Sequence, residues 1–177
     1  MARPQKNGLL YYPKDVNLCN EFRMQLLLAK YGATGWGMHD YILSRLFDSW
    51  YFILCDDDNA LIIANSLNLD FEFFKEMLGF MFSKGIFNRE MYDRYKILTT
   101  HEIQRTWLFG STKKTAIRII NEFWLIDERE ILNQRALENV VFSDINDATA
   151  EFFPEKTPQI KVKEIKEKKK NIEKKER

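Results

Sequence analysis

The chain is short of glycine and proline, with seven and four of them among its 177 residues. A turn-rich sandwich or barrel uses more of both, so the composition favours helices. No apolar run reaches the roughly 18 residues of a membrane span. Arg, Pro, Gln and Lys occupy positions 3–6, where a signal peptide would have its apolar region. We therefore expect a cytoplasmic protein with no membrane-bound part.

Cysteine and histidine are equally scarce, with two of each. Cys19 and Cys55 are too few for a disulfide framework, which favours reduced thiols and an intracellular compartment. His39 and His101 stand at no metal-ligand spacing from either cysteine. We expect no metal site and no cofactor.

Two short motifs resemble catalytic or cation-binding loops only superficially. Residues 110–115 contain Gly, Ser, Thr and two Lys, but they lack the Gly-Lys-Ser/Thr ending and the preceding strand of a phosphate loop. Residues 56–58 are three Asp without the spacing, the Gly or the distal Glu of a calcium loop, so helix capping is the better interpretation. No motif indicates a nucleophilic triad, and we predict no enzymatic activity.

Aromatic residues and an uneven charge distribution are the features that the chain has in abundance. Phe, Tyr and Trp make up 14% of the sequence, enough for a dense core. Residues 155–177 hold ten basic and five acidic residues, a net charge of +5, whereas the rest holds 17 bases and 21 acids, a net charge of −4. A basic tail contacts nucleic acid or an acidic surface in some proteins and is merely solvated in others.

Hydrophobic periodicity predicts five helices in the first two thirds of the chain. The predicted N-caps are Asn20, one of the three aspartates at 56–58, Asp70, and Thr99 or Thr100. Their side chains accept hydrogen bonds from free backbone N–H groups. Glycines 32 and 35 are predicted to form a turn, and glycine 85 is predicted to end the fourth helix. The predicted helices span residues 21–31, 36–49, 60–67, 71–84 and 101–114.

The element order predicts a mainly α fold with a small β-hairpin wing, a winged helix-turn-helix followed by a helical extension. Residues 50–55 form the first predicted strand, and residues 86–98 form the wing from strands at 86–88 and 96–98 around a loop or helical turn. We expect the winged-helix module at residues 1–126, with a strand or packing segment at 123–126. A helical extension follows at 127–153, its helix ending near residue 141, and residues 154–177 are a disordered tail or a lone helix.

The predicted recognition helix, residues 71–84, is a poor DNA reader. Its polar arc holds two acids and one base, and it has no Arg, Asn or Gln for base edges. Its apolar arc is wider than one core face requires. Phe73 and Phe80 are seven residues apart on one side of the helix, so either they form an oligomer interface or other helices cover them.

A better nucleic-acid surface follows the predicted wing. No acid occurs from residue 103 to residue 121, and Ser and Thr hydroxyls there are suited to phosphate oxygens. The alternative is an ordinary solvated helix face. The predicted DNA-binding residues are Arg105, Lys113, Lys114 and Arg118, joined by Arg3 and Lys6 at the N-terminus and by the tail lysines.

Four stretches carry a resemblance to a known family. They are residues 1–15 with Arg3-Pro4 and Tyr12-Pro13, residues 32–47, the run 80–87 that contains Phe-Met-Phe-Ser-Lys-Gly, and residues 91–105 with Ile103-Gln104-Arg105. Over about residues 1–114 the chain resembles the N-terminal domain of phage and prophage replisome-organiser-like proteins, which is related to the DnaD N-terminal winged helix.

The resemblance implies DNA binding in replication initiation, usually ahead of a second, C-terminal domain. It also implies helicase or helicase-loader partners, and the DnaD-like winged helix is known for self-association. The chain ends in its Lys/Glu tail where family members often continue, so we expect a truncated member or one that uses only this module. Our first hypothesis is a DNA-binding protein, on single or double strands with low sequence readout. The alternative is an oligomerisation module with little DNA affinity.

Overall fold

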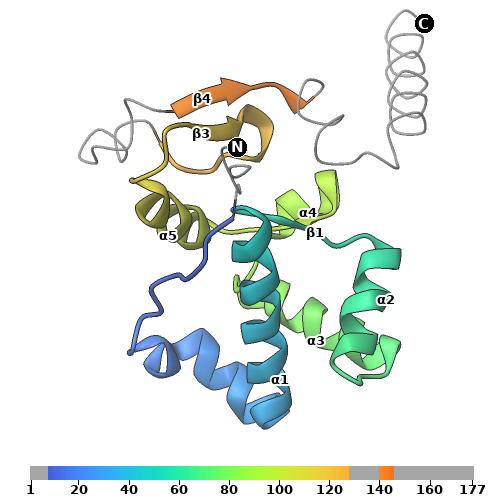
Figure 1. The fold of residues 1–177 in the computed structure, drawn as a ribbon. Coiled ribbons are helices and arrows are strands. Elements are labelled where there is room, and N and C mark those ends of the chain that lie inside the picture. The colour runs from blue at the N-terminus through green and yellow to red at the C-terminus, as the bar shows by residue number, and fades with distance from the viewer. Residues whose placement is uncertain (1–7, 128–139, 146–177) are drawn as a thin grey trace, which may run out of the picture. The chain divides into compact units, whose positions relative to one another are not determined.

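The computed structural model describes residues 8–127 and 140–145. Predicted features at Arg3, at Lys6, over most of the helical extension and in the tail lie outside these residues. The chain divides into two compact units, Met1–Ile117 with Leu125–Val140 and Arg118–Trp124 with Val141–Arg177, and each is considered by itself (Figure 1).

The first unit is mainly helical, as the sequence predicts. Five α-helices, one 3-10 turn and a two-stranded sheet account for its regular structure within the described residues. In chain order its elements are η1 (Leu18–Asn20), α1 (Phe22–Ser49), β1 (Ile53–Leu54), α2 (Asp57–Ser66), α3 (Phe71–Ser83), α4 (Arg89–Tyr95), β2 (Ile97–Leu98) and α5 (His101–Ser111).

Helix α1 replaces the two helices predicted for residues 21–49. Its path bends at Gly32, where φ is +58° and ψ is −145°, a conformation that glycine adopts without the steric penalty of a Cβ atom. The predicted turn is therefore a kink inside one element. The predicted cap at Asn20 is also wrong, because the N-cap residue is Glu21 and its side chain makes no capping hydrogen bond.

The other predicted caps are confirmed. Of the three aspartates, Asp56 is the cap and accepts a hydrogen bond from the backbone of Asn59 at 3.1 Å. Asp70 does the same from Phe73 at 3.0 Å. Of the two threonine candidates, Thr100 caps α5. Each cap satisfies a backbone N–H in the first turn, which fixes where α2, α3 and α5 begin.

The predicted hairpin wing is wrong. Residues 86–88 form no strand, and Asn88 instead caps the seven-residue helix α4 by accepting a hydrogen bond from the backbone of Met91 at 3.0 Å. Strand β2 pairs with β1, which precedes α2, in an antiparallel ladder that places Ile53 opposite Leu98. The i,i+4 ion pairs Arg89–Asp93 and Glu90–Arg94 add a little to a local preference for helix where a loop or turn was expected.

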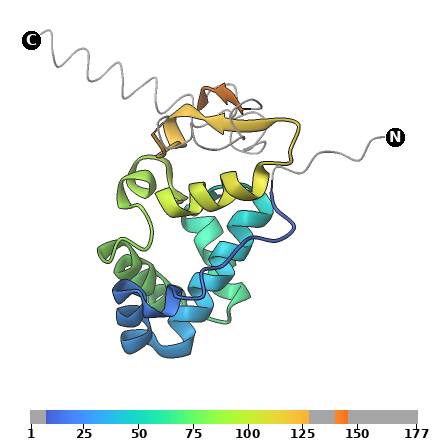
Figure 2. The same cartoon turned by 90° about the vertical axis from the view of Figure 1, so that its left-hand side faces the viewer.

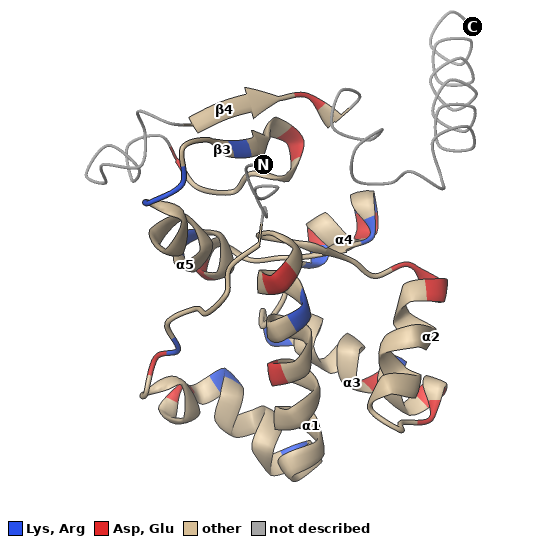
Figure 3. Ribbon diagram, in the orientation of Figure 1, with Lys and Arg blue, Asp and Glu red and all other residues tan. Residues whose placement is uncertain are grey.

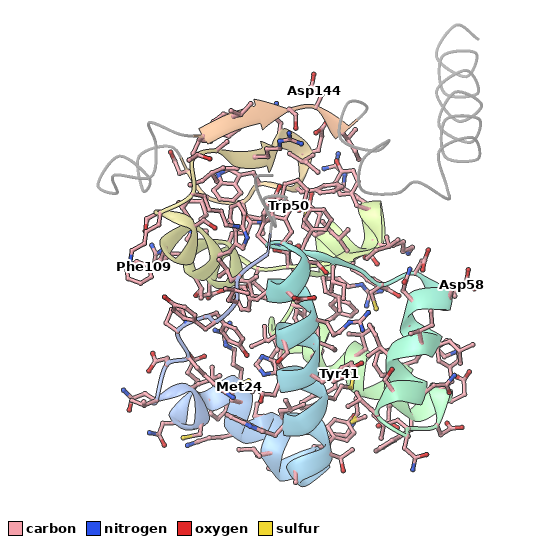
Figure 4. The ribbon with its side chains drawn as sticks, in the orientation of Figure 1. Met24, Tyr41, Trp50, Asp58, Phe109 and Asp144 are labelled. Atoms are coloured by element: carbon pink, nitrogen blue, oxygen red, sulfur yellow. The ribbon has the colours of Figure 1, made fainter. Side chains whose placement is uncertain are left out.

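The core of the first unit lies where α1, α3 and α5 meet the β1–β2 ladder (Figure 1 and Figure 2). Helix α5 lies across the end of α1, and the Trp107 ring is 6.5 Å from that of Trp50 and 5.0 Å from that of Tyr51, centroid to centroid. Figure 4 shows the side chains that fill the space between these elements. The largest side chains under 2% exposed in this unit include Trp107, Tyr51, Phe74, Phe87, Met24, Leu27, Met38 and Ile42.

The segment before η1 has no regular structure but is tied to α1. Leu9 donates a backbone hydrogen bond to the Phe47 carbonyl at 2.6 Å, and the rings of Tyr12 and Phe47 stack with centroids 4.3 Å apart. A Cβ atom on Gly8 would lie 1.8 Å from the Asp48 carbonyl oxygen, so this close approach requires glycine. This segment, residues 8–17, therefore runs along α1, and we call it the N-terminal strap.

The second unit contains most of a small sheet that the sequence did not predict. Strand β3 (Ile117–Ile120) pairs with β4 (Val140–Ser143), and η2 (Asn121–Phe123) follows β3. Asn121 donates a hydrogen bond to the Asp144 carboxylate at 3.0 Å. The predicted helix that ends near residue 141 is therefore wrong at its end, where β4 lies. Residues 124–126 form neither helix nor strand, which leaves the packing alternative for 123–126.

Within the described residues, no helix combines the length and apolarity required to cross a membrane. The same residues contain no cluster of three or more His, Cys, Asp or Glu side chains arranged to hold a metal ion.

Candidate nucleic-acid interface

Helix α5 presents one buried face and one exposed face. Ile103, Trp107 and Leu108 are buried with the neighbouring Gln104, whereas Arg105 and Phe109 are exposed. Residues four apart on a helix lie on the same face, with Cβ atoms about 5–6 Å apart. The Arg105 guanidinium and the Phe109 ring are therefore neighbours on the outer face of α5.

Buried hydrogen bonds fix the rotation of α5 about its axis. The Gln104 amide donates to the Thr99 hydroxyl at 3.3 Å and accepts from the Leu125 backbone at 2.7 Å. The Thr99 hydroxyl in turn donates to the Tyr51 carbonyl at 2.7 Å. Breaking this chain would leave buried polar groups unsatisfied, which costs about 1–3 kcal/mol per group. The network holds Gln104 inward and thereby Arg105 and Phe109 outward.

The predicted phosphate-binding residues do not all lie on this face. Arg105 and Lys113 are exposed, and Lys113 lies two residues beyond the end of α5. Figure 3 shows basic residues on α5 and on the chain that follows it. Arg118 is also exposed but lies on β3 in the second unit. The structure thus brings Arg105 and Lys113 onto one helix and its continuation, and it does not place Arg118 with them.

Lys114 points back into the first unit. Its Nζ donates to the Gly8 carbonyl at 3.1 Å and lies 5.3 Å from the centroid of the Trp107 ring. Partial burial lowers the pKa of Lys114 to about 8. In this position Lys114 anchors the N-terminal strap to the end of α5, which sequence reasoning did not anticipate.

The one acid on the outer face of α5 is engaged by a base from α1. Glu102 Oε1 accepts from Arg23 at 3.5 Å, and the same guanidinium also contacts Glu21 at 2.7 Å and the Gly85 carbonyl at 3.2 Å. This ion pairing moderates the negative charge at the start of the helix. Beyond it, residues 103–121 contain no acid.

Phe109 is the surface residue that sequence reasoning missed. It is 62% exposed, although a phenylalanine ring gains free energy by leaving water. Figure 4 labels it at the outer edge of α5, directed away from the core. A helical wheel of residues 101–111 would have found it, because Phe109 follows Arg105 by four residues on the polar face.

A pocket of about 240 Å³ lies between the strap, α1 and α5. Arg105 and Arg23 line it, together with His39, which is 5% exposed and whose Nδ1 has no hydrogen-bond partner within residues 8–127 and 140–145. Burial lowers the pKa of His39 to about 4, so the ring is neutral at pH 7. Three bases and three acids line the pocket. This balance makes it a poorer site for an anion than the outer face of α5.

Helix α3 carries the predicted oligomer-interface residues. Phe80 is half-buried and Phe73 is 38% exposed. Tyr31 of α1 packs edge-on against both rings, with centroids 5.4 Å from Phe80 and 5.9 Å from Phe73. Lys30 also lies 5.0 Å from the Phe80 ring and 3.1 Å from the Glu76 carboxylate. Helix α1 therefore covers part of this face and leaves Phe73 exposed.

These features define a mainly helical domain with a two-stranded sheet and a basic outer face on α5. The chain belongs to the Lin1244/Lin1753-like N-terminal family, whose model matches residues 11–103. It is also similar to a Listeria innocua protein named "Uncharacterized phage-related protein Lin1244/Lin1753", with 26% identity over 171 residues that cover 94% of this chain and 56% of that protein. The chain thus spans about half the length of this curated relative. No solved structure matches it.

The comparisons confirm the coarser part of the resemblance, a family with a phage-related member. The matched residues run from the strap through α1–α4 to the first residues of α5. Most of the acid-free stretch therefore lies beyond the family match. Kinship with the DnaD winged helix and a role in replication remain predictions.

Proposed function

We propose that this chain is a DNA-binding protein of phage or mobile-element origin that acts in replication initiation through a DnaD-like module. The observation that carries the proposal is the outer face of α5, where Arg105 and Lys113 are exposed and the nearest acid, Glu102, is engaged by Arg23. Neutralising backbone phosphates supplies most non-specific affinity for DNA. Two exposed bases on a surface whose one acid is ion-paired suit that purpose.

The same arrangement predicts low sequence readout. Exposed side chains of α5 offer one guanidinium and no amide, because Gln104 is buried in the hydrogen bonds with Thr99 and Leu125. Helix α3 offers no better reader, since Glu72 and Glu76 lie on its exposed face. Contacts to phosphates position a protein without selecting a base sequence.

The test is a fluorescence-anisotropy titration of the full chain with single- and double-stranded DNA at low and moderate salt. We expect salt-sensitive binding that Arg105→Glu with Lys113→Glu weakens on every sequence alike. The matched control is Lys75→Glu with Lys84→Glu, which makes the same change in net charge on α3 and at its C-cap. Equal losses in both double variants would remove α5 from the proposal, and no binding at low salt would overturn it.

A second function, self-association, is favoured by one observation on α2 and α3. Leu61 and Ile62 of α2 are 43% and 54% exposed, and Phe73 of the adjoining α3 is exposed as well. Exposed apolar side chains on neighbouring helices are typical of interfaces. Light scattering that shows a monomer at high concentration would count against this function, as would a Phe73→Ser variant with unchanged molar mass.

A further inference from the structure

The position of Phe109 between two bases points to a more specific ligand than DNA in general. An exposed aromatic ring on a helix surface offers a flat apolar face to any planar group that can reach it. Arg105 lies four residues before Phe109 and Lys113 four residues after it, and no acid lies between them. The Thr112 hydroxyl donates to the Phe109 carbonyl at 3.1 Å and so holds the chain that leads from the ring to Lys113.

Two other exposed phenylalanines of the first unit lack this setting. Phe22, at the start of α1, is 75% exposed, but its neighbours Glu21 and Arg23 are engaged with each other. Phe73 faces Tyr31 and lies on the same exposed side of α3 as Glu72. The Phe109 ring has no ring or cation contact among the described residues. Of these three phenylalanines, Phe109 is the best placed to contact a ligand that carries negative charge.

The bases of a duplex stack on one another, so a ring on a protein surface cannot stack on them. A single strand can turn its bases outward, where an aromatic side chain can reach them. Stacking on aromatic side chains beside a basic groove is the usual means of binding single strands without sequence preference. Arg105 and Phe109 are separated by about 6 Å along the helix axis, a distance that one nucleotide spans between its phosphate and its base.

We propose that Phe109 is a base-stacking residue and that the outer face of α5 binds single-stranded DNA in preference to duplex DNA. This inference rests on the proposed function and names its ligand. Arg105 and Lys113 hold phosphates on either side, while Phe109 stacks on one base between them. The surface discriminates between the two forms of DNA because only the single strand presents a free base.

The experiment compares the full chain with three variants on a labelled oligothymidine of about 20 nucleotides and on a duplex of equal length. Phe109→Leu removes the π face and keeps an apolar side chain, whereas Phe109→Tyr keeps the ring. Phe22→Leu is the matched control, an exposed phenylalanine on α1. We expect Phe109→Leu to weaken single-strand binding about fivefold to a hundredfold. Duplex binding should change less than about twofold, and Phe109→Tyr and Phe22→Leu should bind as the wild type.

A second measurement needs no variant. Oligothymidine with 5-iodouracil in place of some bases cross-links under light to aromatic side chains that stack on it, and we expect the cross-linked peptide to contain Phe109. Single-strand binding that Phe109→Leu leaves intact, or a cross-link confined to other peptides, would overturn the inference while the proposed function stands. Failure to bind either DNA at low salt would overturn the proposed function itself.

Discussion

Helices α3 and α5 both carry aromatic side chains on the side that faces away from the core, yet their surroundings differ. On α3, Phe73 and Phe80 meet the Tyr31 ring, and Lys30 pairs with Glu76 beside them. On α5, the Phe109 ring is 62% exposed and is followed by bases. The kink at Gly32 begins directly after Tyr31, so the bend in α1 lies beside the covered face of α3.

The comparison teaches that an aromatic-rich helix is not by itself an interface. Helix α3 is much the more apolar of the two, and the sequence made it the obvious candidate for a surface that binds something. The structure shows that the more polar α5 presents the more exposed ring. What a neighbouring helix covers decides which apolar side chain is available to a partner.

The largest expected effect is on the free energy of unfolding, and it comes from the buried face of α3. Phe74 of α3 is fully buried, so Phe74→Ala should lower the free energy of unfolding by about 3–5 kcal/mol through lost burial and a residual cavity. Phe109→Ala on α5 should change it by less than about 0.5 kcal/mol. Urea denaturation followed by tryptophan fluorescence measures both. Similar losses in the two variants would mean that Phe109 is part of the core.

A smaller effect should follow from uncovering α3. Tyr31→Ala removes two edge-on ring contacts, each worth about 0.5–1.5 kcal/mol, and it exposes Phe73 and Phe80. We expect a loss of about 1–2 kcal/mol in urea denaturation and stronger self-association in sedimentation velocity. Tyr31→Phe, which keeps the ring but loses the hydrogen bond to Glu76, is the control and should stay close to the wild type. Unchanged sedimentation of Tyr31→Ala would show that this face does not self-associate.

The smallest effect concerns the lysines at the two helices. Hydrogen bonds from Lys30 to Tyr31 and Glu76 raise its pKa, whereas burial lowers the pKa of Lys114 from 10.5 to about 8. Between pH 8 and 10.5 the unfolded chain holds the Lys114 proton more tightly than the folded one, so stability from this group rises with pH there.

Urea denaturation at several pH values across that window can isolate the contribution of Lys114. The wild type should gain stability relative to Lys114→Met as the pH rises above 8, because the folded protein then escapes the cost of burying a charge. Parallel pH profiles for the two proteins would show that folding does not lower the pKa of Lys114.

The features that the sequence could predict are local ones. Asp56, Asp70 and Thr100 each accept a hydrogen bond from the backbone N–H three residues further on, so a local sequence pattern is enough to predict a cap there. The mainly helical content follows from periodicity in the same way. The pairing of β1 with β2 joins residues 53 and 98 across three helices, and no local pattern distinguishes it from a hairpin.

In the candidate site, too, local features could be predicted and long-range contacts could not. The acid-free stretch and its bases can be read from the sequence. Which of these bases are held by contacts inside the folded protein cannot. Lys114 is drawn inward by the Gly8 carbonyl, 106 residues away in the chain. Phe109 was overlooked because a phenylalanine is presumed to be buried, and only the packing of Trp107 and Leu108 leaves it outside.

The strap has a practical consequence for anyone who prepares the protein. A Cβ atom on Gly110 would lie 2.6 Å from the Leu9 side chain, and Lys114 bonds to Gly8, so the chain passes beside the end of α5 as it enters the fold. An affinity tag or fluorescent fusion at the N-terminus therefore joins the described chain at residue 8, beside the end of α5. A polyhistidine tag left in that position would add cationic side chains to the surface whose affinity is being measured, so cleaved and uncleaved preparations belong side by side in every titration.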